Sequence, residues 1–207
     1  MAAAAAAVLI GAVMLNRGPG LQVLDSAGTG PVQVGGVSVP LSDQRELQSR
    51  IKFGVELEVP VRATIDLWAK DIAIYEVTGG TRMTLPASPG RWIGRSVECS
   101  VFVGEVRLRT GERFSGSELR FYTPDGIVEV SGTLLSVQCD TLGTCVCVLE
   151  GSARVGVDED DLELVTPGHR KIMLRDGTKK IIPVKPMHRD GVLDFSERME
   201  KRLKQGE

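Results

Sequence analysis

The chain has 207 residues, of which 42% are hydrophobic and 25% are charged, so it can bury a sizeable core and wholesale disorder is not expected. Its formal net charge is −2 at pH 7, which argues against a nucleic-acid partner, because proteins that bind nucleic acid usually carry a basic surface. Glycine is abundant at 24 residues and aromatic residues make up only 4%, a composition that favours short strands and tight turns over long helices.

The first predicted element is an apolar, uncharged stretch at residues 2–15. As a helix it would span about 21 Å, which is short of the roughly 30 Å hydrocarbon core of a bilayer. We expect residues 1–16 to be a transmembrane anchor, whose reading frame would continue upstream of Met1, or a signal segment; a disordered low-complexity start is the third alternative. Either of the first two exports the rest of the chain. The expectation is a single-pass protein of the inner (cytoplasmic) membrane, with its bulk in the periplasm or outside.

Residues 17–40 are rich in Gly and Pro, a composition that predicts a linker without a packed core. A short amphipathic helix is expected next, at residues 42–49, with Ser42 as its N-cap.

Residues 41–182 form the predicted folded domain. Apolar residues recur there with a period of two, as in Ile65, Leu67 and Ala69, in short runs separated by Gly, Pro and Asp turn signals. Such a spacing indicates an all-β domain, either a sandwich, a barrel or a solenoid of short strands. No run is followed by a helix long enough for a βαβ crossover, which excludes a doubly wound parallel sheet.

The last predicted element is a charged tail at residues 183–207. Asp194 or Ser196 would cap a short helix over residues 197–204, and its many charges predict that it is solvated.

A known domain has turn and strand residues at the same spacing as one segment of this chain. The segment begins at Thr123-Pro124, runs through Gly132-Thr133 and continues to Gly151. It resembles the signature of the FecR family, a T-P-x-x-x-V-x-V-x-G-T run followed by a strand, a turn and a V-x-V-x-x-G ending. The similarity extends over about residues 50–182. The matching positions are Thr123, Pro124, Gly126, Val128, Val130, Gly132, Thr133, Val146, Val148 and Gly151.

The resemblance implies a short-stranded β-solenoid or sandwich-like FecR domain. Such domains are typically the periplasmic part of transmembrane regulators, in which a cytoplasmic anti-sigma region precedes one transmembrane helix and the outer domain senses an outer-membrane transporter. The implied function is a membrane-tethered, extracytoplasmic module that binds another protein and transmits a signal. A sigma-factor system is an expected partner only if a region upstream of residue 1 exists. A structural cell-envelope protein without a signalling role is the alternative.

The signature residues are of the kinds that build a scaffold. Pro124 and Gly126 suit a turn, and Gly132 is expected at a bulge or close strand crossing, where a side chain would obstruct. We therefore expect Gly132→Val to reduce stability, and we expect the acidic residues 158–161 to tolerate substitution.

Four cysteines offer the most chemistry: Cys99, Cys139, Cys145 and Cys147. The last three lie across a predicted hairpin, and in an oxidising compartment a disulfide from Cys139 to Cys145 or Cys147 is the favoured interpretation. Buried unpaired cysteines are the second alternative. A zinc or other thiolate metal site is the third, because C-x-C lacks the usual zinc spacing, and a catalytic thiol is the last.

Nothing else in the sequence indicates catalysis. Nucleotide-binding, hydrolase and metalloprotease motifs are absent, and the two histidines, His169 and His188, stand beside basic residues where solvated side chains are usual. The acidic run at residues 158–161 lacks the spaced ligands of a calcium loop. We expect no enzyme, no cofactor, no metal ion, no small-molecule substrate and no nucleic acid. The expected partner is another protein, engaged by strand addition to an exposed strand edge or by loops.

Overall fold

The computed structural model describes residues 20–70, 72–87, 96–111, 114 and 118–205. The apolar segment at residues 1–16, predicted to anchor the chain, lies outside them. Most described residues are in strands, as the sequence predicts. The strands are β1 (Leu21–Gly28), β2 (Pro31–Val34), β3 (Val37–Pro40), β4 (Glu56–Glu58), β5 (Ala63–Ala69), β6 (Ala73–Val77), β7 (Arg82–Thr84), β8 (Ser96–Thr110), β9 (Glu118–Thr123), β10 (Gly126–Val130), β11 (Leu134–Cys139), β12 (Gly143–Glu150), β13 (Ala153–Gly156), β14 (Glu163–Val165), β15 (His169–Leu174) and β16 (Lys179–Pro183). The helices are α2 (Gln44–Arg50), the 3₁₀ turn η2 (Glu159–Asp161) and α3 (Pro186–Gln205).

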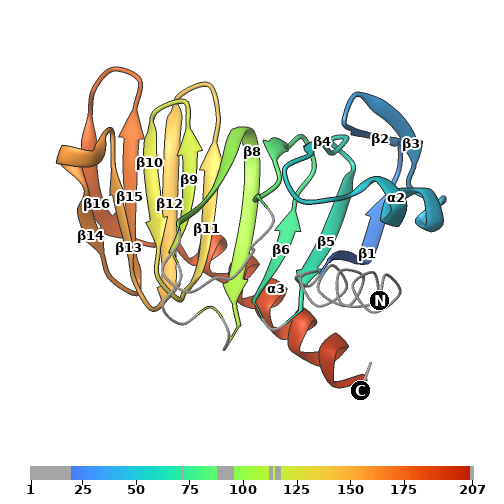
Figure 1. Ribbon diagram of the computed structural model, residues 1–207. Helices are drawn as coiled ribbons and strands as arrows, with labels where there is room; N and C mark the ends of the chain where they lie inside the picture. The colour runs from blue at the N-terminus through green and yellow to red at the C-terminus, as the bar shows by residue number, and fades with distance from the viewer. Residues whose placement is uncertain (1–19, 71, 88–95, 112–113, 115–117, 206–207) are drawn as a thin grey trace, which may run out of the picture.

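The strands form two layers that share β8 (Figure 1). Sheet A has the order β1-β5-β6-β8-β11-β12-β15-β16, and sheet B has the order β3-β2-β4-β7-β8-β9-β10-β13-β14. All neighbours are antiparallel except β8 and β9. The result is the sandwich-like alternative of the sequence analysis, with an open sheet whose ends are not joined.

Strand β8 changes sheets at Gly104. Before it, Val101 pairs with β7 of sheet B, and after it Val106 pairs with β6 of sheet A. Gly104 has φ +97°, and a Cβ there would lie 2.4 Å from the Thr81 Cα, so only glycine fits. The Thr81 hydroxyl accepts from the Glu105 N–H at 2.9 Å and donates to the Glu105 carbonyl at 3.1 Å. These bonds satisfy the backbone at the crossing.

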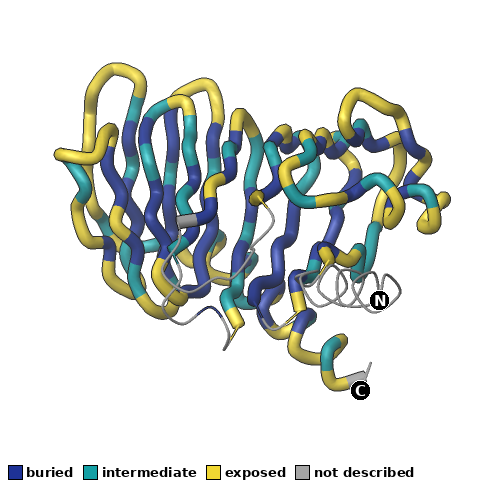
Figure 2. Tube along the Cα trace, in the orientation of Figure 1, coloured by how far each residue is buried: buried dark blue, intermediate teal, exposed yellow. Residues whose placement is uncertain are grey.

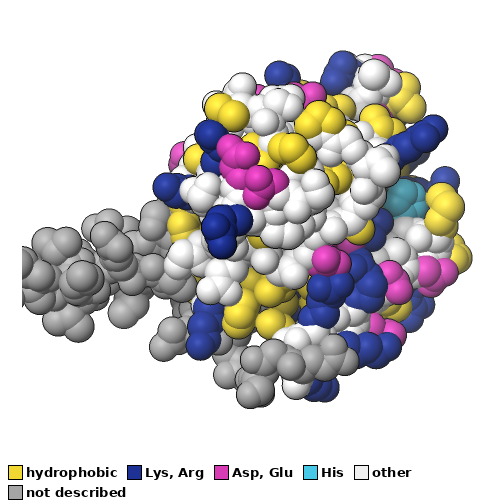
Figure 3. Space-filling view, turned by 90° about the vertical axis from the view of Figure 1, so that its right-hand side faces the viewer, with side chains coloured by type: hydrophobic (Ala, Val, Ile, Leu, Met, Phe, Trp, Pro, Cys, Tyr) yellow, Lys and Arg dark blue, Asp and Glu magenta, His cyan; other side chains and the backbone are white. Residues whose placement is uncertain are grey.

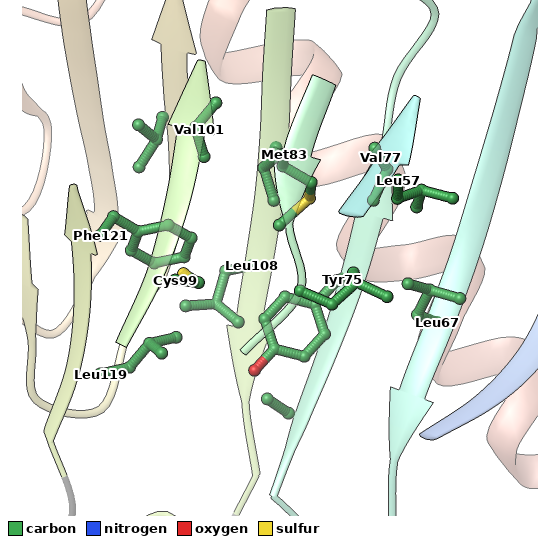
Figure 4. Close-up of a cluster of buried hydrophobic side chains, with 14 of the residues drawn as sticks. Leu57, Leu67, Tyr75, Val77, Met83, Cys99, Val101, Leu108, Leu119 and Phe121 are labelled. Atoms are coloured by element: carbon green, nitrogen blue, oxygen red, sulfur yellow. The ribbon is translucent and has the colours of Figure 1, made fainter. Parts of the chain in front are cut away.

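The core lies between the layers (Figure 2). Figure 4 shows side chains from both sheets meeting there: Phe121 and Cys99 come from sheet B, whereas Tyr75 and Leu108 come from sheet A. Each is at most 3% exposed, so the predicted alternation of apolar residues points into one shared interior.

Residues 17–40 are not a linker over the described part, and this prediction was wrong. β1 pairs with β5, and β2 and β3 form a hairpin whose Val32, Val34 and Val39 are buried. The glycines that suggested flexibility, such as Gly35 and Gly36, sit at turns with positive φ, between strands that keep the apolar alternation.

The two helices also differ from expectation. Asp43, not Ser42, caps α2, because its carboxylate accepts from the Glu46 N–H at 2.9 Å. The C-terminal helix is long and packed, not short and solvated: Val192, Phe195 and Met199 are fully buried. Their spacing of three and four residues forms an apolar stripe along the helix. The many charged residues around them led to the expectation of a solvated helix.

Substitution of Gly104, compared with Gly132, tests the crossing, because both glycines have positive φ but only Gly104 is closely packed. Gly104→Ala is expected to cost about 2–5 kcal/mol, from left-handed backbone strain and from overpacking against Thr81. Gly132→Ala should cost only about 1–2 kcal/mol, because φ is +84° but a Cβ would have no neighbour within 4 Å. Urea unfolding of both variants beside the parent measures the difference. Equal losses would show that β8 does not depend on close packing at Gly104.

The open space around Gly132 also bears on Gly132→Val. This variant is expected to lose stability through the strained φ and not through crowding.

Candidate functional site

Helix α3 lies across the outer face of sheet A (Figure 1), and this face also carries buried carboxylates and two of the four cysteines. Alternate residues of each strand point outward, and part of this face is apolar. Phe195 and Met199 of α3 pack there with Ile74 of β6 and Leu134 of β11. The helix therefore covers a hydrophobic strip that would otherwise face water.

Ion pairs continue the contact between α3 and sheet A. Arg198 of α3 pairs with Glu76 and lies 3.6 Å from Asp66, both of which are almost fully buried on the sheet. Arg107 of β8 donates to Glu76 at 2.7 Å. Farther along the helix, Arg202 pairs with Asp25 of β1. Because the carboxylates are buried, α3 supplies the charges that compensate them.

Asp66 is the least well compensated member of this network. Burial, and next the nearby Glu76 carboxylate, raise the pKa of Asp66 to about 6, against a smaller opposing effect of Arg198. Its Oδ1 is buried without a hydrogen-bond partner among the described residues. The ionised form of Asp66 is therefore a source of instability near neutral pH.

The predicted disulfide from Cys139 is absent, since the strand register separates the thiols. Asp140 accepts from the Leu142 and Gly143 N–H groups and sets a turn in which Cys139 pairs with Thr144 and Cys145 with Gln138. Directly opposed residues share a face, so Cys139 points into the core whereas Cys145 and Cys147 point outward. All four cysteines are free, and burial raises the pKa of Cys99 and, to about 11, of Cys139.

The outward pair lies close to a cation. Cys145 and Cys147 Sγ are 3.9 Å apart, and Arg170 Nη1 of β15 is 4.0 Å from Cys145 Sγ. Sequence reasoning missed Arg170, because nothing in the order of residues pairs it with Cys147. The alternation of buried and exposed residues along β15 is enough to place Arg170 on the outer face. Only the pairing of β15 with β12 shows that Arg170 lies beside the two sulfur atoms.

The signature residues are arranged as scaffold. Val128, Val130, Val146 and Val148 are fully buried. Thr123 donates to the Gly126 carbonyl at 2.9 Å and fixes the turn between β9 and β10. A Cβ at Gly151 would lie 2.0 Å from the Gly132 carbonyl oxygen, so the chain passes itself closely there. Thr133 is buried, and its N–H donates to Thr110 at 2.8 Å. The Thr144 hydroxyl donates to the Thr123 hydroxyl at 3.1 Å, so this signature residue also ties β9 to β12.

The remaining polar candidates form ordinary surface contacts. His169 Nδ1 lies 3.2 Å from the Thr166 hydroxyl, and the acidic residues 158–161 form the capped turn η2. Among the described residues, no three His, Cys, Asp or Glu side chains converge as metal ligands. No helix of the described part is long and apolar enough to cross a membrane.

The strand edges differ in how well they are covered. At the β1 end, Gln48 of α2 accepts from the Val23 N–H at 2.8 Å and donates to the Leu21 carbonyl at 3.0 Å, which occupies this edge. Figure 3 shows this end, where hydrophobic, acidic and basic side chains are interspersed. At the opposite end β16 pairs only with β15, and no described strand pairs with its outer edge.

Comparison with solved structures shows a shared fold. Two crystal structures, at 1.65 and 2.50 Å, of a candidate anti-sigma factor from Parabacteroides distasonis ATCC 8503 each match with a TM-score of 0.50 and 21% sequence identity. Each alignment covers 62% of this chain and 59% of the other, so the chain spans well under two thirds of those proteins. No family model and no curated protein matches the sequence.

Asp66→Asn tests the buried carboxyl. The pKa of Asp66 is raised in the folded state from 3.8 to about 6, so the folded protein binds the proton more tightly and loses stability as pH rises through this window. Asn cannot ionise, so the variant should gain roughly 2–3 kcal/mol on the parent at pH 7.5 and less than about 1 kcal/mol at pH 4. Urea unfolding at both pH values measures this. Asp190→Asn on the exposed part of α3 is the control, and a gain that does not depend on pH would contradict the interpretation.

Proposed function

We propose that this chain is a FecR-type regulatory module that binds a protein partner outside the cytoplasm and transmits a signal, and that it is not an enzyme. The shared fold with a candidate anti-sigma factor supports this proposal, together with the FecR-like signature around Thr123 and Gly132. The apolar residues 2–15 supply the membrane tether. The periplasmic side of the inner membrane is the proposed location, and a sigma-factor system is the proposed pathway.

The open edge of β16 is the proposed binding site, and its hydrogen-bonding groups follow from the register. Leu174 N–H donates to the Thr178 carbonyl and Val184 N–H to the Gly168 carbonyl, so even-numbered residues of β16 bond to β15. In an antiparallel ladder the backbone N–H and C=O groups of the odd-numbered residues of β16 then point away from β15. The N–H and C=O groups of Lys179 and Ile181 therefore face outward. They form a template for one added strand.

The side chains at this edge indicate what the strand would carry. Lys180 is exposed and Ile181 is 38% exposed, whereas Lys179 Nζ already pairs with Asp161 Oδ1 at 2.8 Å. An extended partner segment with acidic and apolar residues in alternation would be complementary to Lys180 and Ile181. Lysines on an edge also discourage pairing with a second copy of the chain, because the like charges would meet. The occupant proposed for β16 is therefore an acidic strand of a different protein.

Ile181→Pro tests the edge. The substitution removes an outward N–H without removing a bond to β15, so proline is tolerated there and unfolding should shift by less than about 2 kcal/mol. Binding of the partner recovered by crosslinking from the source cell should weaken at least tenfold, measured by calorimetry with purified proteins. Ile181→Thr keeps the N–H and should bind as the parent does.

Signalling is tested separately by transcript profiling after overproduction of the parent and of Ile181→Pro. A regulator changes a discrete set of transcripts, and the proline variant should not. If neither protein changes any transcript, the structural cell-envelope alternative gains support. If both variants bind and act as the parent does, the β16 edge is not the site.

A further inference from the structure

The outer face of sheet A holds two thiols in an arrangement that its packing does not require. Cys145 and Cys147 are separated by one residue on β12, and their Sγ atoms are 3.9 Å apart. Two residues along a strand span about 6.6 Å between Cα atoms, which is near the upper end of the range that a disulfide bridges. Cys145 is partly exposed whereas Cys147 is only 2% exposed, so a reagent reaches Cys145 first.

A buried cation faces the same pair. Arg170 is 7% exposed, its Nε has no hydrogen-bond partner, and no carboxylate of the described residues lies within ion-pair distance of it. Arg170 stands directly opposite Cys147 in the β12–β15 ladder, and the pattern of backbone bonds makes this a non-hydrogen-bonded pair, in which side chains approach closely. A guanidinium so placed lacks a counter-charge, and a thiolate at Cys145 supplies one.

The titration of Cys145 agrees with this geometry. A hydrogen bond from the Cys147 thiol, and next the Arg170 guanidinium, lower the pKa of Cys145 to about 7, although burial and the Asp140 carboxylate raise it. The hydrogen bond to Cys145 and burial raise the pKa of Cys147, so that Cys147 keeps its proton while Cys145 is the anion.

We infer that Cys145 and Cys147 form a redox-active dithiol, in which Cys145 attacks low-molecular-weight disulfides and Cys147 resolves the product. The Cys145 thiolate forms a bond to one sulfur of the disulfide R–S–S–R, and the other sulfur leaves as R–S⁻ and takes up a proton. The mixed disulfide removes the negative charge from Cys145, so Cys147 can lose its proton. Cys147 then attacks Cys145 Sγ, releases the second R–S⁻ and leaves a Cys145–Cys147 disulfide. The protein loses two electrons and two protons, and the small disulfide becomes two thiols.

Oxidised glutathione is the probe for this reaction. The full chain is incubated with it, free thiols are alkylated, and the peptide between Arg120 and Arg154 is sequenced by mass spectrometry. The parent should contain a Cys145–Cys147 disulfide that dithiothreitol reverses. Cys147→Ser should stop at a glutathione adduct on Cys145, and Cys145→Ser should remain unmodified. Cys139→Ser, on the inner face of the same hairpin, should react as the parent does.

The role of Arg170 has its own readout. The rate of Cys145 alkylation by iodoacetamide should rise with pH about a midpoint near pH 7. Arg170→Met should move this midpoint upward, and each unit of pKa should slow alkylation at pH 6 by roughly threefold, because the loss of thiolate outweighs the gain in nucleophilicity. Arg175→Met, at an exposed arginine beyond β15, is the matched control and should leave the midpoint unchanged.

Three outcomes would overturn the inference. The parent could keep four free thiols under conditions that fully modify the urea-unfolded chain. Cys139 could appear in the disulfide instead of Cys145. The folded chain could bind zinc stoichiometrically and resist glutathione, in which case the pair is a thiolate metal site.

Discussion

The fold depends on the passage of β8 from one sheet to the other. Gly104 has a positive φ and leaves no room for a Cβ beside the Thr81 backbone. The Thr81 hydroxyl bonds to both backbone groups of Glu105 where the ladder of sheet B ends. A single strand thereby belongs to both layers, and its inward side chains change from odd to even residue numbers across Gly104. The other strands pair outward from β8, so the shared interior and both outer faces are positioned by this crossing.

The outer face of sheet A is a consequence of that arrangement. The chain leaves β16 and returns across sheet A as α3, which buries Phe195 against apolar residues and brings Arg198 to the buried carboxylates Asp66 and Glu76. The helix thus combines hydrophobic burial with charge compensation, and the apolar contacts are expected to contribute most of the stability, because buried ion pairs contribute little net stability. Beside the helix, the Cys145–Cys147 pair and Arg170 remain without such a carboxylate partner.

The two ends of the sandwich are treated differently. Gln48 occupies the backbone groups of β1, whereas no described strand pairs with the outward backbone groups of Lys179 and Ile181 in β16. Within the open end, the buried Lys171 donates to the Val155 carbonyl at 2.7 Å and lies 3.6 Å from Glu163, which holds the two sheets together there. These contacts support the β15–β16 end, where strand addition is proposed.

The all-β class of the fold could be predicted from local sequence patterns. Alternating runs such as Ile65, Leu67 and Ala69 predicted strands with one buried face, and the Pro124–Gly126 turn was recognisable because proline and glycine act locally. The tertiary structure decided what depends on register and on distant partners. Residues 21–28 formed a strand because β5 offered an edge, and the β2–β3 hairpin joined sheet B because β2 pairs with β4. Helix α3 became long because sheet A offered its apolar strip. In the β11–β12 hairpin Cys139 pairs with Thr144 and points into the core, whereas Cys145 points outward beside Arg170. A register shifted by one residue would have placed Cys139 and Cys145 on the same face, because the side-chain period of a strand is two.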